Sequence, residues 1–269
     1  FMKLTVLADN NTFIDQYYLG EPAVSYYIEI DDCRILFDTG YSDAFLRNAQ
    51  RLGIDLGAIT HLVLSHGHND HTGGLHALLD SFDLSHVTLI AHPGCFEPKR
   101  DGDLVIGSPL TENEIRSRFL YQPAKTPMEL SSHCQFLGEI PTLLPFEPRY
   151  AIGKAFRLGQ WATDFLFDDS ALVCKTKNGL FVISGCSHSG ICNITEYAMQ
   201  LTGIHQLAGV IGGFHLFETG HRLAETIRYF SGCDLTALYP CHCVSLKAKC
   251  EMYKASLPIH EVGVGMTIN

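Results

Sequence analysis

At the start of the chain, short apolar, strand-like runs alternate with polar turn segments, and this pattern predicts strands. The first three runs are Lys3–Ala8, Ala23–Ile30 and Arg34–Asp38, and the last two are separated by the turn signal Asp31-Asp32. This pattern predicts a β-meander. The spacing changes after Ser42-Asp43, where apolar residues recur on one helical face until a glycine ends the segment. A short buried strand is expected to follow this helix.

The last hundred residues alternate between strand and helix patterns. A hairpin is predicted from Ser170–Thr176 and Leu180–Ser184, because the Lys177-Asn178-Gly179 segment between them is a turn sequence. Helices are then predicted at Ile191–Leu201, His221–Phe230 and Ser245–Tyr253, and strands at Leu207–Ile211 and Leu235–Tyr239. Such alternation is typical of an α/β protein with helices packed on a sheet.

Regular periodicity is lost between Cys95 and about Trp161, where Pro and Gly are frequent. The clearest element there is a helix capped by Thr111, with Glu114 three residues later. We interpret residues 95–161 as an inserted lid or subdomain, and residues 2–94 and 162–269 as one main domain. A chain of 269 residues is long enough for one large core with such an insert.

Composition narrows the class of protein. With 46% hydrophobic and 18% charged residues, the chain is expected to fold as a soluble globular protein. A net charge of −10 disfavours nucleic acid as a partner. No apolar run is long enough to span a membrane, and the start lacks a secretory signal pattern, so we expect a cytoplasmic protein. The ten cysteines should then be mostly buried free thiols.

Four side chains of metal-ligand type lie within six residues directly after the buried run His61–Ser65. They belong to His66-Gly67-His68-Asn69-Asp70-His71. Imidazole and carboxylate groups are typical zinc ligands. In an extended turn, His66 and His68 point to one side, and Asp70 and His71 face a neighbouring position. The cluster therefore predicts two adjacent metal ions.

This cluster carries a family resemblance. The segment Ser65–Gly74 resembles the His-x-His-x-Asp-His signature of the metallo-β-lactamase superfamily, and Leu36–Gly40 resembles its first motif, whose aspartate orients metal-binding histidines. The resemblance implies an αβ/βα four-layer sandwich of the α/β class. It also implies two divalent metal ions. We expect zinc, with manganese and iron as alternatives.

Three further segments resemble one branch of the superfamily, which includes the dihydropterin ribofuranosyl-aminobenzene-phosphate synthases. These segments are Ser184–Ile191, Ile211–Leu216 and Tyr239–Cys243. Many proteins of this branch are called metal-dependent hydrolases. The resemblance therefore implies the fold more firmly than the substrate.

The remaining metal ligands are expected among the downstream histidines. His188 and His242 each follow a predicted strand, where an α/β sheet presents functional residues. We predict a metal-binding set of His66, His68, Asp70, His71, His188 and His242. Three residues stay open as ligands: Cys186, Asp168 and His92, the last with an outer or structural role preferred. Cys241 and Cys243 flank His242 and are predicted to point away from the metal as core thiols.

Two residues are candidates for catalysis. Asp70 could orient the attacking nucleophile, and His215, beside Gly212-Gly213, could contact substrate or transfer a proton. The start of the helix near Gly190 is expected to offer backbone donors to an anionic substrate group.

We expect a small-molecule substrate, and a phosphorylated substrate is among the alternatives. The preferred function is metal-assisted hydrolysis of a small ester, lactone or phosphoester. The alternative is the transferase reaction implied by the resemblance, in which a ribosyl-aminobenzene phosphate displaces diphosphate from a pterin. A third class is a non-enzymatic sensor that uses the insert to dock a ligand or partner. The sequence leaves the substrate and the oligomeric state open.

Overall fold

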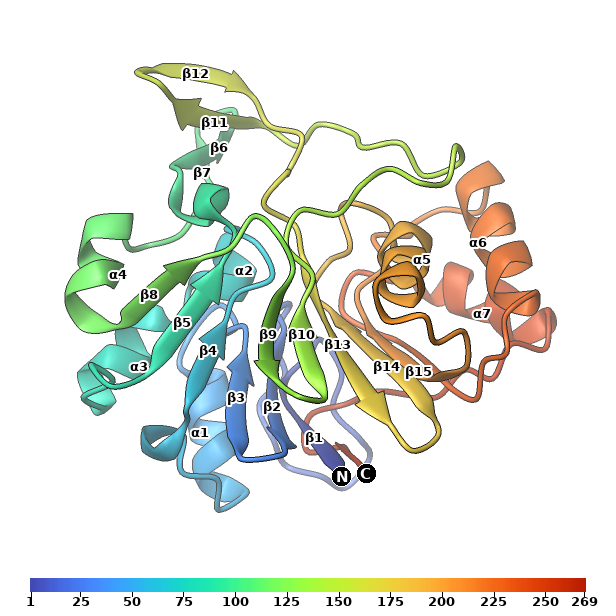
Figure 1. The fold of residues 1–269 in the computed structure, drawn as a ribbon, viewed down its shortest axis with the longest axis horizontal. Helices are drawn as coiled ribbons and strands as arrows, with labels where there is room; N and C mark the ends of the chain where they lie inside the picture. The colour runs from blue at the N-terminus through green and yellow to red at the C-terminus, as the bar shows by residue number, and fades with distance from the viewer.

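Two large sheets form the centre of the computed structural model, which describes residues 1–269 (Figure 1). The first sheet has the strand order β17 (Thr267–Ile268), β1 (Met2–Ala8), β2 (Ser25–Ile30), β3 (Cys33–Phe37), β4 (His61–Val63), β5 (Thr88–Ala91) and β8 (Leu120–Pro123). The second has the order β16 (Leu238–Pro240), β15 (Leu207–Gly212), β14 (Gly179–Ser184), β13 (Ala171–Thr176), β10 (Cys134–Phe136) and β9 (Met128–Ser131).

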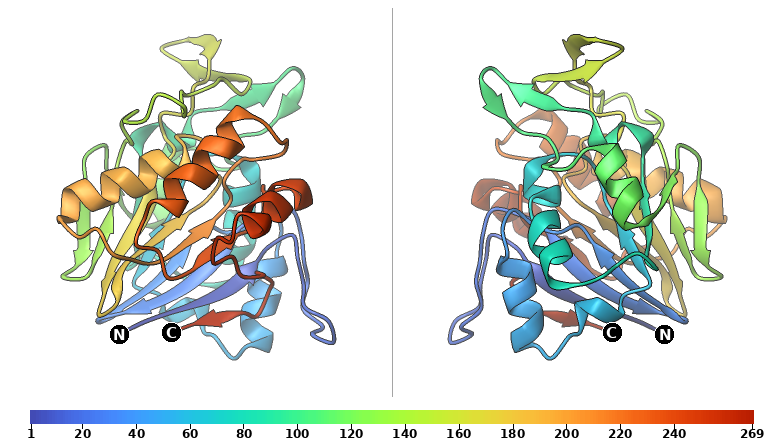
Figure 2. Two further views of the ribbon diagram at one scale, coloured as in Figure 1. Left: turned by 90° about the vertical axis from the view of Figure 1, so that its right-hand side faces the viewer. Right: turned by 90° about the vertical axis from the view of Figure 1, so that its left-hand side faces the viewer.

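Helices cover the outer faces of both sheets. On the first sheet they are α1 (Ala44–Arg51), α3 (Leu75–Ser81) and α4 (Glu112–Arg118), and on the second α5 (Ile191–Thr202), α6 (His221–Ser231) and α7 (Leu246–Lys254) (Figures 1 and 2). Three short helical turns complete the set: α2 (Asn69–Thr72) and the 3₁₀ turns Leu56–Ala58 and Pro93–Phe96. The result is the αβ/βα four-layer sandwich that the resemblance implied.

Strand residues alternate between two cores, which explains why their sequences are almost continuously apolar. In β3, Ile35 and Phe37 enter the core between the two sheets, whereas Leu36 packs against the helices of the first sheet. In β14, Ile183 enters the central core and Val182 packs under the helices of the second sheet. Both sheets are therefore buried on both faces.

Most of the predicted elements are present. β1, β2 and β3 pair antiparallel as a meander, and β13 and β14 form the predicted hairpin. The helix after Thr111 begins with a complete capping box, in which Thr111 and Glu114 bond each other's backbone. All ten cysteines are free. No helix in the structure has the length and hydrophobicity needed to cross a bilayer.

Residues 95–161 are spread over all three sheets of the structure. A separate four-stranded sheet, in the order β12 (Gln160–Thr163), β11 (Lys154–Arg157), β6 (Lys99–Asp101) and β7 (Leu104–Val105), lies at the opposite end of the molecule from the two termini (Figure 1). In contrast, β8 extends the first large sheet, and β9 and β10 extend the second. The boundaries of a separate insert stay a prediction.

Candidate metal centre

The predicted site residues come together where several parallel strands end. The histidine turn follows β4, Cys186 and His188 follow β14, His215 follows β15, and His242 follows β16. β14, β15 and β16 run parallel, as do β3 and β4. Their carboxyl ends therefore meet at one edge of the sandwich, as expected for functional residues in α/β folds.

Three histidines form a first group, here called the trio: His66, His68 and His188. One nitrogen of each lies within 4.8 Å of the others. All three residues are buried, and Nε2 of His66, Nε2 of His68 and both ring nitrogens of His188 have no hydrogen-bond partner. Burial lowers the pKa of each ring, that of His68 to about 4, so all three are neutral near pH 7. Unpaired buried nitrogens are unfavourable, and neutral imidazoles are the form that binds metal.

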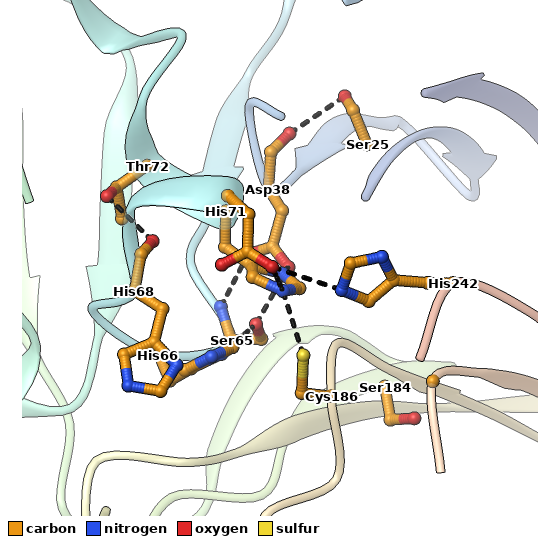
Figure 3. Close-up of polar contacts among 12 residues, drawn as sticks. Ser25, Asp38, Ser65, His66, His68, His71, Thr72, Ser184, Cys186 and His242 are labelled. Carbon is orange, nitrogen blue, oxygen red and sulfur yellow. Dashed lines mark hydrogen bonds and ion pairs between the residues drawn. The ribbon is translucent and has the colours of Figure 1, made fainter. Parts of the chain in front are cut away.

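The second group, here called the quartet, consists of Asp70, His71, Cys186 and His242. Its ligand atoms already contact one another. His71 Nε2 lies 3.1 Å from Cys186 Sγ and 3.6 Å from Asp70 Oδ2, and His242 Nε2 lies 3.1 Å from the same carboxylate oxygen. Figure 3 shows His71, Cys186 and His242 converging from separate segments of the chain. Cys186, which sequence analysis left open, joins this group.

A buried carboxylate orients the quartet. Asp38 Oδ2 lies 2.6 Å from His71 Nδ1, and the same side chain accepts hydrogen bonds from the backbone N–H and the hydroxyl of Ser65 (Figure 3). Burial favours the neutral His71 ring, but the carboxylates of Asp70 and Asp38 outweigh it and raise the pKa of His71 well above its usual range. The contact between Asp38 and His71 agrees with the orienting role predicted for this aspartate.

A different buried network supports the trio. Asp168 accepts a hydrogen bond from the backbone N–H of Gly67, which lies between His66 and His68. The other oxygen of Asp168 lies 3.0 Å from the ammonium of Lys99, whose side chain is fully buried and also contacts Asp164. Asp168 therefore belongs to neither ligand group and instead holds the turn. Lys99 was missed because no sequence pattern around it indicates burial.

His92 also lies outside both groups. Its Nδ1 accepts a hydrogen bond from the N–H of Gly94, and its Nε2 contacts Glu139. Both nitrogens therefore have partners within the protein. This arrangement agrees with the structural role preferred for His92.

The prediction for the two cysteines around His242 is correct for one and wrong for the other. Cys241 is buried, with its sulfur 3.1 Å from the hydroxyl of Tyr26. Cys243, however, lines the same cavity as Cys186 and His242. The reason is the backbone of His242, whose φ of +52° interrupts the period-two alternation on which the prediction relied.

The predicted anion site at the start of α5 is also wrong. The buried carboxylate of Glu147 accepts hydrogen bonds from the backbone N–H groups of Cys192 and Asn193 in the first turn of this helix. An internal anion therefore occupies the donors that a substrate group would need. Glu147 comes from the irregular segment before β11, where periodicity gave no position for it.

A cavity of about 480 Å³ opens beside both groups. His68 and His188 of the trio and Asp70, Cys186 and His242 of the quartet line it, together with His215. The other lining residues are mostly uncharged: Asn10, Pro22, Tyr41, Asn69, Asp101, Ile106, Ile152, Phe217 and Cys243. No Lys or Arg is among them. Positive charge in this cavity would therefore have to come from bound cations.

Unusual backbone conformations are found at the same edge of the sandwich, where the site residues follow the strands. Asp38, Ser187, His215 and His242 all adopt left-handed conformations, with φ between +48° and +58°. Non-glycine residues rarely adopt this region. Each residue that the surroundings hold there costs about 1–3 kcal/mol of conformational free energy. These turns follow β3, β14, β15 and β16 and point the site residues towards the cavity.

The donor atoms of both groups fit divalent cations. The trio supplies three neutral imidazoles, each with at least one ring nitrogen free of protein partners, and the quartet supplies carboxylate, imidazole and thiol groups. These are the ligand types of zinc and related ions.

Comparison with known proteins agrees with this geometry. The family model described as the metallo-beta-lactamase superfamily matches residues 19–101. A protein of Methanocaldococcus jannaschii whose function is uncharacterized is 31% identical, and the alignment covers 91% of each chain. The crystal structure of a metal-dependent hydrolase of the beta-lactamase superfamily superposes with a TM-score of 0.85 over 100% of this chain and 99% of the other, at 28% identity.

The chain belongs to the metallo-β-lactamase superfamily. Within this superfamily it is also similar to the 7,8-dihydropterin-6-methyl-4-(β-D-ribofuranosyl)-aminobenzene-5'-phosphate synthase of Methanocaldococcus jannaschii. That enzyme is 29% identical, and the alignment covers 92% of this chain and 89% of the enzyme. Both the family and the four-layer fold predicted from the histidine motif are thus confirmed.

Proposed function

We propose that the chain is a metal-dependent hydrolase that cleaves a small ester, lactone or phosphoester at a dinuclear centre. The observation that carries this proposal is the pair of adjacent ligand groups opening into one cavity. In this proposal the trio would hold one divalent ion and the quartet the other. Divalent ions in such a centre polarise a substrate oxygen and make water acidic enough to act as a nucleophile near neutral pH.

The protein's own residues would orient the reaction. Asp70 is partly exposed to the cavity and would accept a hydrogen bond from the attacking water. His215 lines the same cavity, with its ring centroid 4.6 Å from that of His188. It would contact the oxygen on which negative charge develops.

The cavity favours a single small substrate with one anionic or polarised group. Its volume lies within the range of small-molecule pockets, and Ile106, Ile152 and Phe217 give it apolar walls. Because it has no Lys or Arg, several phosphate groups would have only the metal centre to neutralise them. This supports hydrolysis over a two-substrate transfer.

The similarity to the synthase supports transfer of a pterin group as a second candidate function. In that case the metal centre would hold diphosphate. Product analysis after incubation with both substrates of that enzyme, and with each alone, separates the two functions. A joined product favours transfer, whereas cleavage without the second substrate favours hydrolysis.

The central test measures metal content by elemental analysis and activity against phosphoesters, lactones and thioesters. The variant H66A/H68A should lose bound metal and all hydrolysis. His86 is exposed and lies outside the cavity, so H86A is a matched control that should behave as wild type. Unchanged metal content and hydrolysis in H66A/H68A would contradict the proposal.

A further inference from the structure

His215 has a specific hydrogen-bond partner that belongs to neither ligand group. The hydroxyl of Tyr150, in the segment between β10 and β11, hydrogen-bonds Nδ1 of His215. The His215 ring is also packed between His188 and Phe217, with ring centroids 4.6 Å from each. Its backbone N–H donates to Cys243 Sγ at 3.3 Å. The ring is therefore held from several sides.

The contact with Tyr150 favours one position for the proton on the His215 ring. The Tyr150 hydroxyl makes no other hydrogen bond in the structure, and burial raises the pKa of Tyr150 so that the phenol keeps its proton. If the phenol donates, Nδ1 of His215 must accept. A neutral imidazole that accepts at Nδ1 carries its proton on Nε2. Nε2 has no protein partner, so its N–H is available to a ligand in the cavity.

Arg222 holds Tyr150 in place. Its guanidinium lies 5.2 Å above the Tyr150 ring, and it donates to the carbonyl of Pro148 at 3.3 Å. The cation therefore links α6 to the segment that carries the tyrosine.

We infer that Tyr150 is a positioning residue that holds His215 as a hydrogen-bond donor, with Nε2–H directed to the substrate beside the trio. The function of that donor rests on the proposed hydrolysis, whereas the position of the proton does not. A donor in this place would stabilise a substrate oxygen on which negative charge develops. It would not serve as the base that removes a proton from water.

The proton position can be measured without a substrate. In zinc-loaded protein labelled with ¹⁵N-histidine, two-bond ¹H–¹⁵N correlations distinguish the Nε2–H from the Nδ1–H form, and H215N identifies the His215 signals. We expect the Nε2–H form in wild type and a mixture of both forms in Y150F. Tyr121 is a partly buried tyrosine whose buried hydroxyl has no partner, so Y121F is the matched control and should leave these signals unchanged. The Nδ1–H form in wild type would overturn the inference.

Kinetics test the role of the donor once a substrate is known. Y150F should lower kcat about tenfold with little change in KM, because the lost interaction acts on developing charge. Y150F combined with H215N should be no slower than H215N alone, since the tyrosine acts through the histidine. Additive losses would overturn the inference. Nε2–H in a protein without hydrolytic activity would instead count against the proposed function and leave the proton position established.

Discussion

The trio and the quartet lie side by side but satisfy their polar atoms in different ways. Nε2 of His66, Nε2 of His68 and both ring nitrogens of His188 have no protein partners, whereas the members of the quartet already contact one another and Asp38. The trio contributes no negative charge, while the quartet includes an aspartate and a thiol. A cation at the trio would therefore replace missing hydrogen bonds, but a cation at the quartet must displace protons.

This difference predicts unequal behaviour. Loss of one trio member leaves two ligands, whereas loss of one quartet member leaves three. Acid should also affect the groups in opposite directions, because burial keeps the trio neutral and carboxylates keep His71 protonated. Four experiments test whether the two groups differ in these ways.

Removal of the buried cation behind the trio should have the largest effect. In K99M, the buried carboxylate of Asp168 loses its ion-pair partner and that of Asp164 keeps only Arg157, so we expect a loss of about 3–5 kcal/mol in the free energy of unfolding. Urea denaturation measures this loss. Lys125 forms a 3.4 Å surface ion pair with Glu139, and K125M is the matched control, with an expected change of about 0–1 kcal/mol. Equal effects of the two substitutions would contradict the role given to Lys99.

Loss of a trio ligand should exceed loss of a quartet ligand. H188N leaves two trio ligands, so we expect the release of about one metal equivalent and a decrease in kcat of more than about 100-fold. H242N leaves Asp70, His71 and Cys186 in place, so it should weaken binding without releasing the ion. Elemental analysis after dialysis compares the variants. Equal metal loss in both would remove the distinction between the groups.

A weaker effect is expected from the carboxylate that orients His71. D38N replaces a charged acceptor by a neutral amide, so affinity for the second metal equivalent should fall by about 10–100-fold while the first is retained. Chelator competition measures both affinities. Asp55 caps a 3₁₀ turn through the N–H of Gly57, so D55N removes a comparable carboxylate away from the site and should change neither affinity. If D38N instead lost only the first, tighter metal equivalent, the assignment of Asp38 to the quartet would be wrong.

The pH dependence of stability should show the smallest differences. Burial lowers the pKa of His68 to about 4, so between about pH 6.5 and 4 the unfolded chain binds more protons than the folded chain. The free energy of unfolding of metal-free protein should therefore fall as the pH falls through this window. The pKa of His71 is raised, so its stabilising contribution is complete below about pH 6.5 and is lost as the pH rises through the raised value.

Urea denaturation of chelator-treated protein, from about pH 4 to above the raised pKa of His71, tests both expected changes in the free energy of unfolding. H68N should reduce the acid-side loss by on the order of 1 kcal/mol, and H71N should reduce the alkaline-side loss. If H68N leaves the loss of unfolding free energy at acid pH unchanged, that loss does not come from protonation of the neutral trio.

Local sequence was sufficient where one short segment carries the geometry. The turn from His66 to His71 follows a buried strand, and period-two geometry places His66 and His68 together. Asp70 and His71 join the other group where the chain turns into the short helix α2. The same reasoning placed His188 and His242 at strand ends. The meander, the hairpin and the capped helix also depend on neighbours within a few residues.

Sequence reasoning failed where contacts connect distant segments that lack regular periodicity. Lys99 contacts Asp168 across 69 positions, and Glu147 reaches the start of α5 across 46 positions. Tyr150 meets His215 in the same way, across 65 positions. Hydrophobic spacing gives no information about such pairs, because they depend on the path of loops. The prediction for Cys243 failed for a local reason, the left-handed backbone of His242.

The four left-handed turns around the cavity have a consequence for how related sequences can be compared. Glycine would relieve the backbone at Asp38, His215 or His242, yet it would remove the side chain that the turn presents. Related proteins that have lost the activity could therefore accept glycine at these positions, whereas active enzymes could not. Within an alignment, retention of bulky polar residues there would distinguish working enzymes from descendants that keep only the scaffold.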